Sequence, residues 1–393
     1  MTATSVRLMH GAQQATPSQS PDSKQEISNK FDKTDWATTE VETTTIPIVS
    51  EEKARTAVQF AFKYSNRELT TRFKVKAIVG FGANGVILAA IDSLSMSNVA
   101  IKIIYKAKSQ LNQQQPPPKE ISSLVSLNEK CRSKSILRAH CAWQDRLHFY
   151  LVTNLFGSNW VKSNLLEPLM FKLQYSNATL FHSFPVSNGA SDLWAWSTMH
   201  RSTGNSVLLS SCLPSDAVKH IARSCFTAVA EMHESGFYHG DIKLENILVQ
   251  KTHDDIRPNI MIADFGQTDC VEYRIMHYGT VEMSAPEFCS DSPFNNTAVI
   301  EAAWIDGRSA DVFALGMVLF LLLSENGLLP AIISDGGRGY HDLLALNNGK
   351  FPFYDDEIVG FGEISLNLVN GMCRVDPAER FTLQQALKHK WFN

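Results

Sequence analysis

Paired cysteines are missing from this chain. Its 393 residues hold seven cysteines, an odd number, and no two of them stand in a C-x-x-C arrangement. Disulfide frameworks and structural zinc sites are built from cysteine pairs, so neither is indicated as an organising feature. We therefore expect reduced thiols and a protein of the cytoplasm, with the nucleus as the second candidate compartment.

An excess of charge of one sign and a long hydrophobic run are missing too. The net charge is −4 and the pI is near 6.3, so no basic face for nucleic acid is indicated. The longest apolar run, VFALGMVLFLLL at 312–323, is shorter than the roughly 20 residues that cross a bilayer. We predict a buried core helix there, and no nucleic-acid or membrane partner. Nothing in the sequence indicates an oligomeric state.

The chain changes character along its length. Residues 1–49 are rich in Ser, Thr and Gln and poor in large apolar groups, which predicts a disordered tail. Helical spacing of apolar residues predicts a helical lead-in over 50–72. Strand patterns fill 73–154 and helical patterns dominate 155–393, with an atypical insertion at about 158–190. The fold class is α+β, with a small antiparallel β-rich half followed by a larger, mainly helical half.

A glycine-rich segment, GFGANG at 80–85, matches G-x-G-x-x-G. In a dinucleotide-binding fold this motif lies between a strand and a helix. Here strand-like residues stand on both sides, and Ile87 continues the second strand. We predict a hairpin whose tip covers phosphates, because glycines let backbone N–H groups approach phosphate oxygens closely.

Three further segments carry polar residues at the ends of apolar runs. Lys102 ends VAIK, and Glu120 begins a plausible helix that would hold the ammonium group in place. YHGDIKLENILV, at 238–249, carries an aspartate, a lysine and an asparagine just ahead of an apolar strand. Asp264 follows the apolar run IMIA, and with Asn246 it supplies the oxygen ligands that Mg²⁺ prefers.

The order of these segments, closed by SAPE at 284–287, resembles the eukaryotic protein kinase superfamily over roughly residues 73–393. The resemblance implies a bilobal fold with a β-rich N-lobe and a helical C-lobe. It also implies transfer of the γ-phosphoryl group of Mg-ATP to a protein hydroxyl.

The resemblance implies a role for each matching polar residue. Asp241 would accept the proton of the substrate hydroxyl, and Lys243 would stabilise charge on the γ-phosphate. Lys102, paired with Glu120, would hold the α- and β-phosphates. The metal ions would be held by Asn246 and Asp264.

Other roles are implied in the same way. Leu155 to Gly157 would be the hinge between the lobes, with Thr153 at its back as the gatekeeper, and Asp311 would brace the catalytic loop. Arg380 would pair with Glu287. The implied nucleotide-binding residues are Gly80, Phe81, Gly82, Ala83, Asn84, Gly85, Ile87, Ala100, Lys102, Thr153, Asn154, Leu155, Phe156 and Leu248.

The substrate class follows from the residue two places after the catalytic aspartate. A lysine there, Lys243, is typical of serine/threonine kinases, so the expected partner is a protein substrate presenting Ser or Thr. SDLWAW (191–196) and YGTVEMSAPEF (278–288) are also similar to segments of PAS-domain kinases and Pim kinases, a weaker resemblance.

One residue departs from the kinase pattern. Gly240 stands where the H-R-D motif has an arginine that pairs with a phosphate on the activation loop. We therefore expect activity that does not depend on activation-loop phosphorylation. The loop, 267–284, carries Thr268, Tyr273, Tyr278 and Thr280, and none of these hydroxyls is an obvious switch.

Two alternatives remain open at this point. A pseudokinase scaffold is one, because Asn84 replaces an aromatic residue at the hairpin tip and the insertion at 158–190 lies beside the expected active site. A small-molecule phosphotransferase is the other, since HGD also occurs in enzymes that resemble aminoglycoside and choline kinases. The SAPE segment, Asp311 and Arg380 favour a protein kinase.

Overall fold

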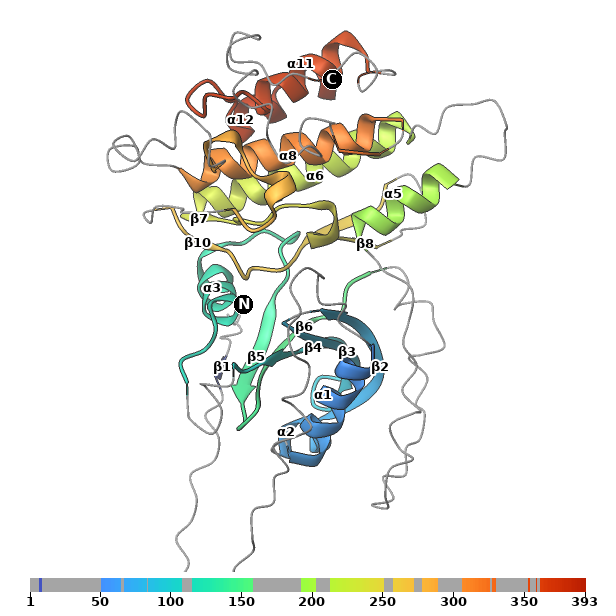
Figure 1. The fold of residues 1–393 in the computed structure, drawn as a ribbon, viewed down its shortest axis with the longest axis vertical. Helices are drawn as coiled ribbons and strands as arrows, with labels where there is room; N and C mark the ends of the chain where they lie inside the picture. The colour runs from blue at the N-terminus through green and yellow to red at the C-terminus, as the bar shows by residue number, and fades with distance from the viewer. Residues whose placement is uncertain are drawn as a thin grey trace, which may run out of the picture.

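The protein forms two lobes that follow one another along the chain (Figure 1). The computed structural model describes residues 7–8, 51–64, 67–82, 84–107, 115–157, 192–202, 213–250, 257–271, 278–288, 306–325, 327–329, 353, 358 and 361–393. The expected insertion at 158–190 lies outside these residues, as does the expected tail apart from Arg7 and Leu8.

The N-lobe is built on one mixed sheet in the order β1-β5-β6-β4-β3-β2. All of its pairings are antiparallel except that of β1 with β5, which is parallel. The strands are β1 (Arg7–Leu8), β2 (Phe73–Gly82), β3 (Gly85–Asp92), β4 (Ser97–Tyr105), β5 (Ala139–Gln144) and β6 (His148–Asn154). The antiparallel sheet expected over 73–154 is confirmed, and two residues of the tail join its edge.

A helical lead-in covers one face of this sheet. Helices α1 (Glu51–Tyr64) and α2 (Arg67–Thr71) lie against β2 and β3, which Figure 1 shows in blue. Buried residues of α1, such as Ala57 and Val58, pack with sheet residues such as Leu88 and Ile101 in one apolar cluster. We call this the outer core; it belongs to the N-lobe alone.

A single helix links the other side of the sheet to the C-lobe. Helix α3 (Lys119–Lys130) buries Ile121, Leu124 and Leu127, which recur at helical spacing. These three belong to a second apolar cluster that continues into the C-lobe, which we call the main core. Because α3 packs in this cluster, its position depends on both lobes.

The C-lobe is mainly helical. Its elements are α5 (Leu193–Ser202), α6 (Ser215–Glu234), β7 (Phe237–Tyr238), η4 (Leu244–Asn246), β8 (Ile247–Gln250), β9 (Asn259–Ile262), β10 (Asp269–Cys270), η5 (Val281–Met283), η6 (Pro286–Phe288), α8 (Gly307–Leu323), α11 (Glu363–Met372), α12 (Leu383–Leu387) and η8 (Lys390–Phe392). Two short sheets, β8 with β9 and β7 with β10, carry the loops that join these helices.

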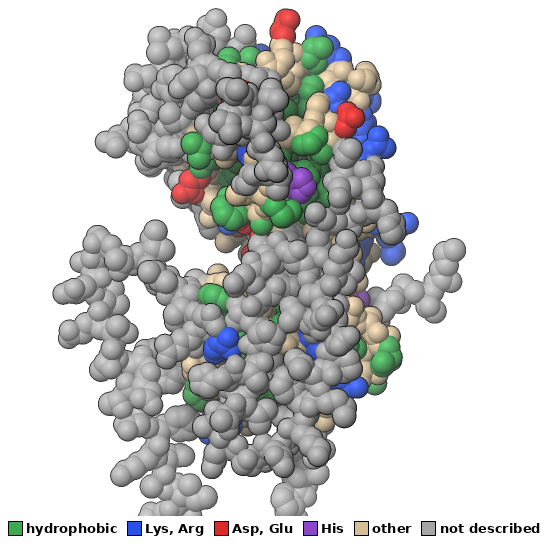
Figure 2. All heavy atoms as spheres, turned by 90° about the vertical axis from the view of Figure 1, so that its right-hand side faces the viewer, with side chains coloured by type: hydrophobic (Ala, Val, Ile, Leu, Met, Phe, Trp, Pro, Cys, Tyr) green, Lys and Arg blue, Asp and Glu red, His purple; other side chains and the backbone are tan. Residues whose placement is uncertain are grey.

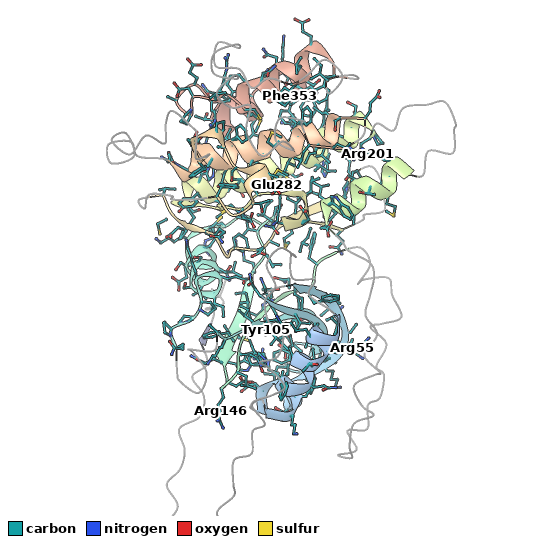
Figure 3. All side chains as sticks on the ribbon, viewed as in Figure 1. Arg55, Tyr105, Arg146, Arg201, Glu282 and Phe353 are labelled. Carbon is teal, nitrogen blue, oxygen red and sulfur yellow. The ribbon has the colours of Figure 1, made fainter. Side chains whose placement is uncertain are left out.

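Helix α8 contains the longest apolar run of the sequence and is buried along almost its whole length. Its N-terminus is capped by Asp306, whose side chain accepts a hydrogen bond from the Arg308 backbone N–H. At its other end Arg201 of α5 donates to the backbone oxygens of Leu321 and Ser324, and Figure 3 labels Arg201 there. The predicted core helix is confirmed, and among the described residues no helix has the length and apolarity of a membrane span.

Candidate active site

The glycine segment forms the hairpin between β2 and β3. Gly82 pairs with Gly85 and Phe81 pairs with Val86 in antiparallel register. A second strand therefore follows the glycines, and the dinucleotide-binding arrangement of strand, turn and helix is excluded. Ala83, at the tip, lies outside the described residues.

Lys102 and Glu120 meet between β4 and α3. The Lys102 Nζ lies 2.6 Å from Glu120 Oε1 and 3.8 Å from Asp264 Oδ1. Burial opposes the charge on Lys102, but the two carboxylates outweigh it and raise the pKa of the ammonium group. The predicted ion pair of Lys102 and Glu120 is confirmed. Glu120 lies 18 positions after Lys102 along the chain, and Asp264 lies 162 positions after it.

Four of the residues predicted to bind the nucleotide lie on four strands, three in the N-lobe and one in the C-lobe. Ile87 on β3 pairs with Lys102, and Ala100 on β4 pairs with Thr153 on β6. Leu248 lies on β8, across from them in the C-lobe. Thr153 is buried, whereas Ile87, Ala100 and Leu248 are half-buried. Their contact with a nucleotide stays a prediction.

A cavity of about 500 Å³ lies against the segment that joins the lobes. Its lining residues are Arg132, Ser133, Lys134, Ile136, Arg138, Asn154, Leu155, Phe156 and Met261. Neither Lys102 nor the glycine hairpin lines it. This cavity is therefore not the whole space that the sequence assigns to ATP, although Asn154, Leu155 and Phe156 of the predicted nucleotide-binding residues line it.

The catalytic loop gathers Asp241, Lys243 and Asn246 with Thr280 of the activation segment. The Thr280 hydroxyl donates to Asp241 Oδ1 at 2.5 Å, and Lys243 Nζ donates to the Thr280 hydroxyl at 2.8 Å. Lys243 Nζ is also 3.4 Å from Asp241 Oδ2. Asn246 Nδ2 donates to the backbone oxygen and Oδ2 of Asp241. The carboxylate of Asp241 is thus oriented by three neighbouring side chains.

Asp311 braces this loop from the buried helix α8. It is fully buried and accepts hydrogen bonds from the backbone N–H groups of His239 and Gly240, at 2.7 and 3.0 Å. His233 Nε2 lies 2.9 Å from Asp311 Oδ2, the oxygen that also accepts from His239. Burial works against the charge of Asp311, but these donors hold the pKa of its carboxyl below the usual value. The predicted bracing role agrees with these contacts.

Gly240 has a backbone conformation that suits glycine. Its φ is +80°, in the left-handed region that other residues adopt only with strain. A Cβ at this position would lie 2.8 Å from the backbone oxygen of Gln267. The chain therefore makes the turn before Asp241 without strain, and without a side chain that could bind a phosphate.

Asp264 and Asn246 provide the oxygen donors for a metal ion. Asp264 has a φ of +62°, unusual for a residue other than glycine, and its side chain is close to half exposed. The amide nitrogen of Asn246 donates hydrogen bonds to Asp241, so its amide oxygen can face a metal ion. One carboxylate and one amide suit a hard divalent ion that also binds phosphates and water. Among the described residues no group of three or more His, Cys, Asp or Glu could hold a metal alone.

A buried ion pair fixes the segment after the activation loop. Arg380 Nη1 donates to Glu287 Oε1 at 2.7 Å, and the second guanidinium nitrogen donates to the other carboxylate oxygen. Both side chains are about 1% exposed. The predicted pair is confirmed, and it is not an ordinary surface contact.

Comparison with known families decides the classification. A model of the protein kinase domain matches residues 194–392, just over half of the chain. The chain belongs to the protein kinase domain family. The family uses ATP and a divalent metal ion. The matched segment covers the C-lobe, and the sheet, the glycine hairpin and the Lys102–Glu120 pair supply the N-lobe of a kinase domain.

Several curated kinases are similar to part of this kinase domain. A probable serine/threonine-protein kinase, fhkB of Dictyostelium discoideum, is 28% identical over 191 residues, which cover 48% of this chain and 15% of that protein. CBL-interacting protein kinase 20 of Oryza sativa subsp. japonica is 30% identical over 186 residues, which cover 46% and 36%. Calcium/calmodulin-dependent protein kinase type 1B of Homo sapiens is 29% identical over 177 residues, which cover 44% and 46%. The chain thus spans less than half the length of these relatives.

Three residues of the kinase site escaped the sequence analysis. Thr280 was noted only as a hydroxyl of the activation loop, yet it contacts both Asp241 and Lys243. His233 and His239 were not singled out, although His239 Nε2 also reaches the backbone oxygen of Ala263. The position of Thr280 four residues before SAPE was the available signal for Thr280, and the HGD segment was the signal for His239. No local pattern marked His233.

Proposed function

We propose that this protein is an active serine/threonine protein kinase that transfers the γ-phosphoryl group of Mg-ATP to a protein hydroxyl. The arrangement of Asp241, Lys243 and Thr280 carries the proposal. Asp241 would accept the hydroxyl proton, and Lys243 would stabilise the charge on the transferred phosphoryl group. Lys102 would hold the α- and β-phosphates with its ammonium fixed by Glu120, a pairing supported by the 2.6 Å contact.

Serine/threonine specificity is proposed on two grounds. Lys243 stands two residues after Asp241, and its Nζ is held by the Thr280 hydroxyl at 2.8 Å. The relatives that the chain matches include proteins named as serine/threonine kinases.

The metal ion is proposed to be Mg²⁺, held by Asn246 and Asp264. It would supply positive charge between the phosphate oxygens. Asp264 lies 3.8 Å from Lys102, so these side chains would bring a metal carboxylate and a phosphate-binding ammonium to the same place. The half exposure of Asp264 is what a ligand shared with substrate and water requires.

Activity without activation-loop phosphorylation is part of the proposal. Gly240 offers no cation for a phosphate, and two hydroxyls of the loop are already engaged. The buried Thr268 hydroxyl donates to the backbone oxygen of His239, and the Thr280 hydroxyl donates to Asp241. At the start of the loop Lys119 of α3 pairs with Asp269 at 2.8 Å. These contacts would order the loop with no phosphate present.

The test is transfer of labelled γ-phosphate from Mg-ATP to a degenerate Ser/Thr peptide library. Asp241→Asn should lower the rate by about a hundredfold or more, because general-base catalysis and orientation are lost together. Asp216→Asn, an exposed aspartate in the first turn of α6, is the matched control and should leave the rate unchanged.

Two results would contradict the proposal. Binding of ATP by calorimetry without transfer by the wild-type protein would favour a scaffold. Transfer to a small alcohol but to no peptide would favour a small-molecule phosphotransferase.

A further inference from the structure

A tyrosine hydroxyl lies between the catalytic loop and the buried helix α8. Tyr278 is 4% exposed, and its hydroxyl donates to Asp311 Oδ1 at 2.9 Å. The hydroxyl oxygen of Tyr278 in turn accepts a hydrogen bond from the backbone N–H of Ile242 at 3.0 Å. Tyr278 therefore joins α8 to Ile242, the residue that directly follows Asp241.

Both hydrogen bonds require a protonated phenol. Burial and, after it, the nearby charge of Asp311 raise the pKa of Tyr278 well above its ordinary value, so the hydroxyl keeps its proton. It can then donate to the carboxylate of Asp311 and accept from Ile242 at the same time. Ile242 is buried, so its N–H would lack an acceptor if the hydroxyl were removed.

The backbone next to Tyr278 holds the same loop. The N–H of Gly279 donates to the backbone oxygen of Gly240 at 2.8 Å. A Cβ on Gly279 would lie 2.6 to 2.8 Å from side-chain atoms of Asp241, so only glycine allows this approach. Thr280 then reaches Asp241 itself. Three successive residues of the activation segment thus contact residues 240–243 of the catalytic loop.

We propose that Tyr278 is a positioning residue for Asp241, and that its hydroxyl fixes the activation segment on the catalytic loop in place of a phosphate bound by an arginine. The inference rests on the proposed kinase activity. Gly240 cannot make a phosphate contact, whereas Tyr278 reaches the same loop from the activation segment and is anchored on Asp311, which also holds the N–H of Gly240. The anchor is built into the sequence and needs no modifying enzyme.

The competing explanation is that the ring of Tyr278 only fills the core. It packs near Phe288, with 6.3 Å between ring centroids. Phenylalanine at 278 would keep that packing and lose only the hydroxyl, so Tyr278→Phe separates the two explanations.

The experiment compares Tyr278→Phe with Tyr150→Phe. Tyr150 is an equally buried tyrosine of β6 whose hydroxyl donates to a carboxylate, Asp145 Oδ2, at 2.6 Å, outside the catalytic loop. Tyr278→Phe should lower kcat for peptide phosphorylation about tenfold, with little change in KM for ATP. The reason is that the variant loses the buried hydrogen bonds that hold the backbone next to Asp241, so the carboxylate of Asp241 is less well oriented. Tyr150→Phe should lower the melting temperature to a similar degree and leave kcat unchanged.

A second readout does not need catalysis. Hydrogen exchange of the Ile242 amide should be at least about tenfold faster in Tyr278→Phe than in wild type, and unchanged in Tyr150→Phe. An inactive wild-type protein would overturn the proposed function, and the exchange rates would still decide the positioning role. Unchanged exchange at Ile242 would overturn the inference, as would a fall in kcat that Tyr150→Phe reproduces.

Discussion

Asp92, at the end of β3, accepts four described hydrogen bonds. Its two oxygens accept from the guanidinium of Arg72 at 2.9 and 2.8 Å, and also from the backbone N–H of Leu94 and the hydroxyl of Ser95. The hydrogen bond from Arg72 lowers the pKa of Asp92 to about 2, against the opposing effect of burial. The charged form of Asp92 is therefore part of the folded state.

This pKa predicts a dependence of stability on pH. The folded-state pKa lies below the ordinary value of 3.8, so the stabilisation is complete above that value and is lost as the pH falls toward about 2. Asp92→Asn should lower the free energy of unfolding by about 1 kcal/mol at neutral pH, after allowance for screening by solvent. Urea unfolding from about pH 6 to pH 3 measures this. A difference from wild type that stays constant over that range would contradict the assignment.

The sequence could predict residues that belong to a motif, and could not predict those whose partners are distant in the chain. The Lys102–Glu120 pair follows from a motif order. The contact of Tyr278 with Asp311 spans 33 positions and depends on how α8 crosses beneath the catalytic loop. A hydroxyl in a loop looks the same in the sequence whether it is exposed or bonded to a buried carboxylate.

At the scale of elements, α1 is an integral part of the N-lobe. Ala54, Val58 and Ala61 are almost completely buried against the sheet. Their spacing predicted a helix, but not the face of the sheet that it covers. The near-continuous apolar run of β3, GVILAAID, was the relevant signal, because a strand covered on both faces does not alternate between apolar and polar residues.

Removal of this packing should destabilise the N-lobe. Val58→Asp would bury an unpaired carboxylate and should cost about 3 kcal/mol or more of the free energy of unfolding. Lys63→Gln, at an exposed position of the same helix, should change it by less than about 0.5 kcal/mol. Urea unfolding of the two variants would compare them. Equal stabilities would mean that α1 is not required for the fold.

At the scale of the whole molecule, described hydrogen bonds join the lobes at two places: residues 135–137 pair with Ile262 of β9, and α3 contacts the start of the activation segment. Ser123 of α3 donates to the backbone oxygen of Thr268 at 2.9 Å, next to the pair of Lys119 and Asp269. Figure 3 labels Glu282, which belongs to the later part of the same segment in the C-lobe.

In the view of Figure 2, charged side chains of both signs occur on the described surface of the upper lobe, in agreement with the small net charge.

These contacts predict how the whole protein responds to dephosphorylation. Phosphatase treatment of the purified kinase, followed by removal of the phosphatase, should leave the initial rate within about twofold of a mock-treated sample, because the proposed ordering of the activation loop uses no phosphate contact. Rate measurements on the two samples provide the check. A loss of activity that returns on incubation with Mg-ATP would show that a phosphate is needed.

The order of the lobes could be predicted from composition, because β-branched runs precede helical ones. The division of the apolar residues into two cores could not. Each core combines residues from separate parts of the chain, as when Ile121 of α3 packs in the same cluster as residues of α8 and Trp391 near the C-terminus. Such grouping is a property of the folded chain and leaves no local pattern.

The two cores determine how the lobes of the kinase are joined. The glycine hairpin β2–β3 packs with α1 in the outer core, whereas α3 packs with the C-lobe in the main core. Strands β4, β5 and β6 supply residues to both cores, as when Ile103 packs in the outer core and its neighbour Ile104 in the main core. The two cores are therefore coupled through the middle strands of the sheet, whereas the described residues of the hairpin, at the edge of the sheet, contribute to the outer core alone.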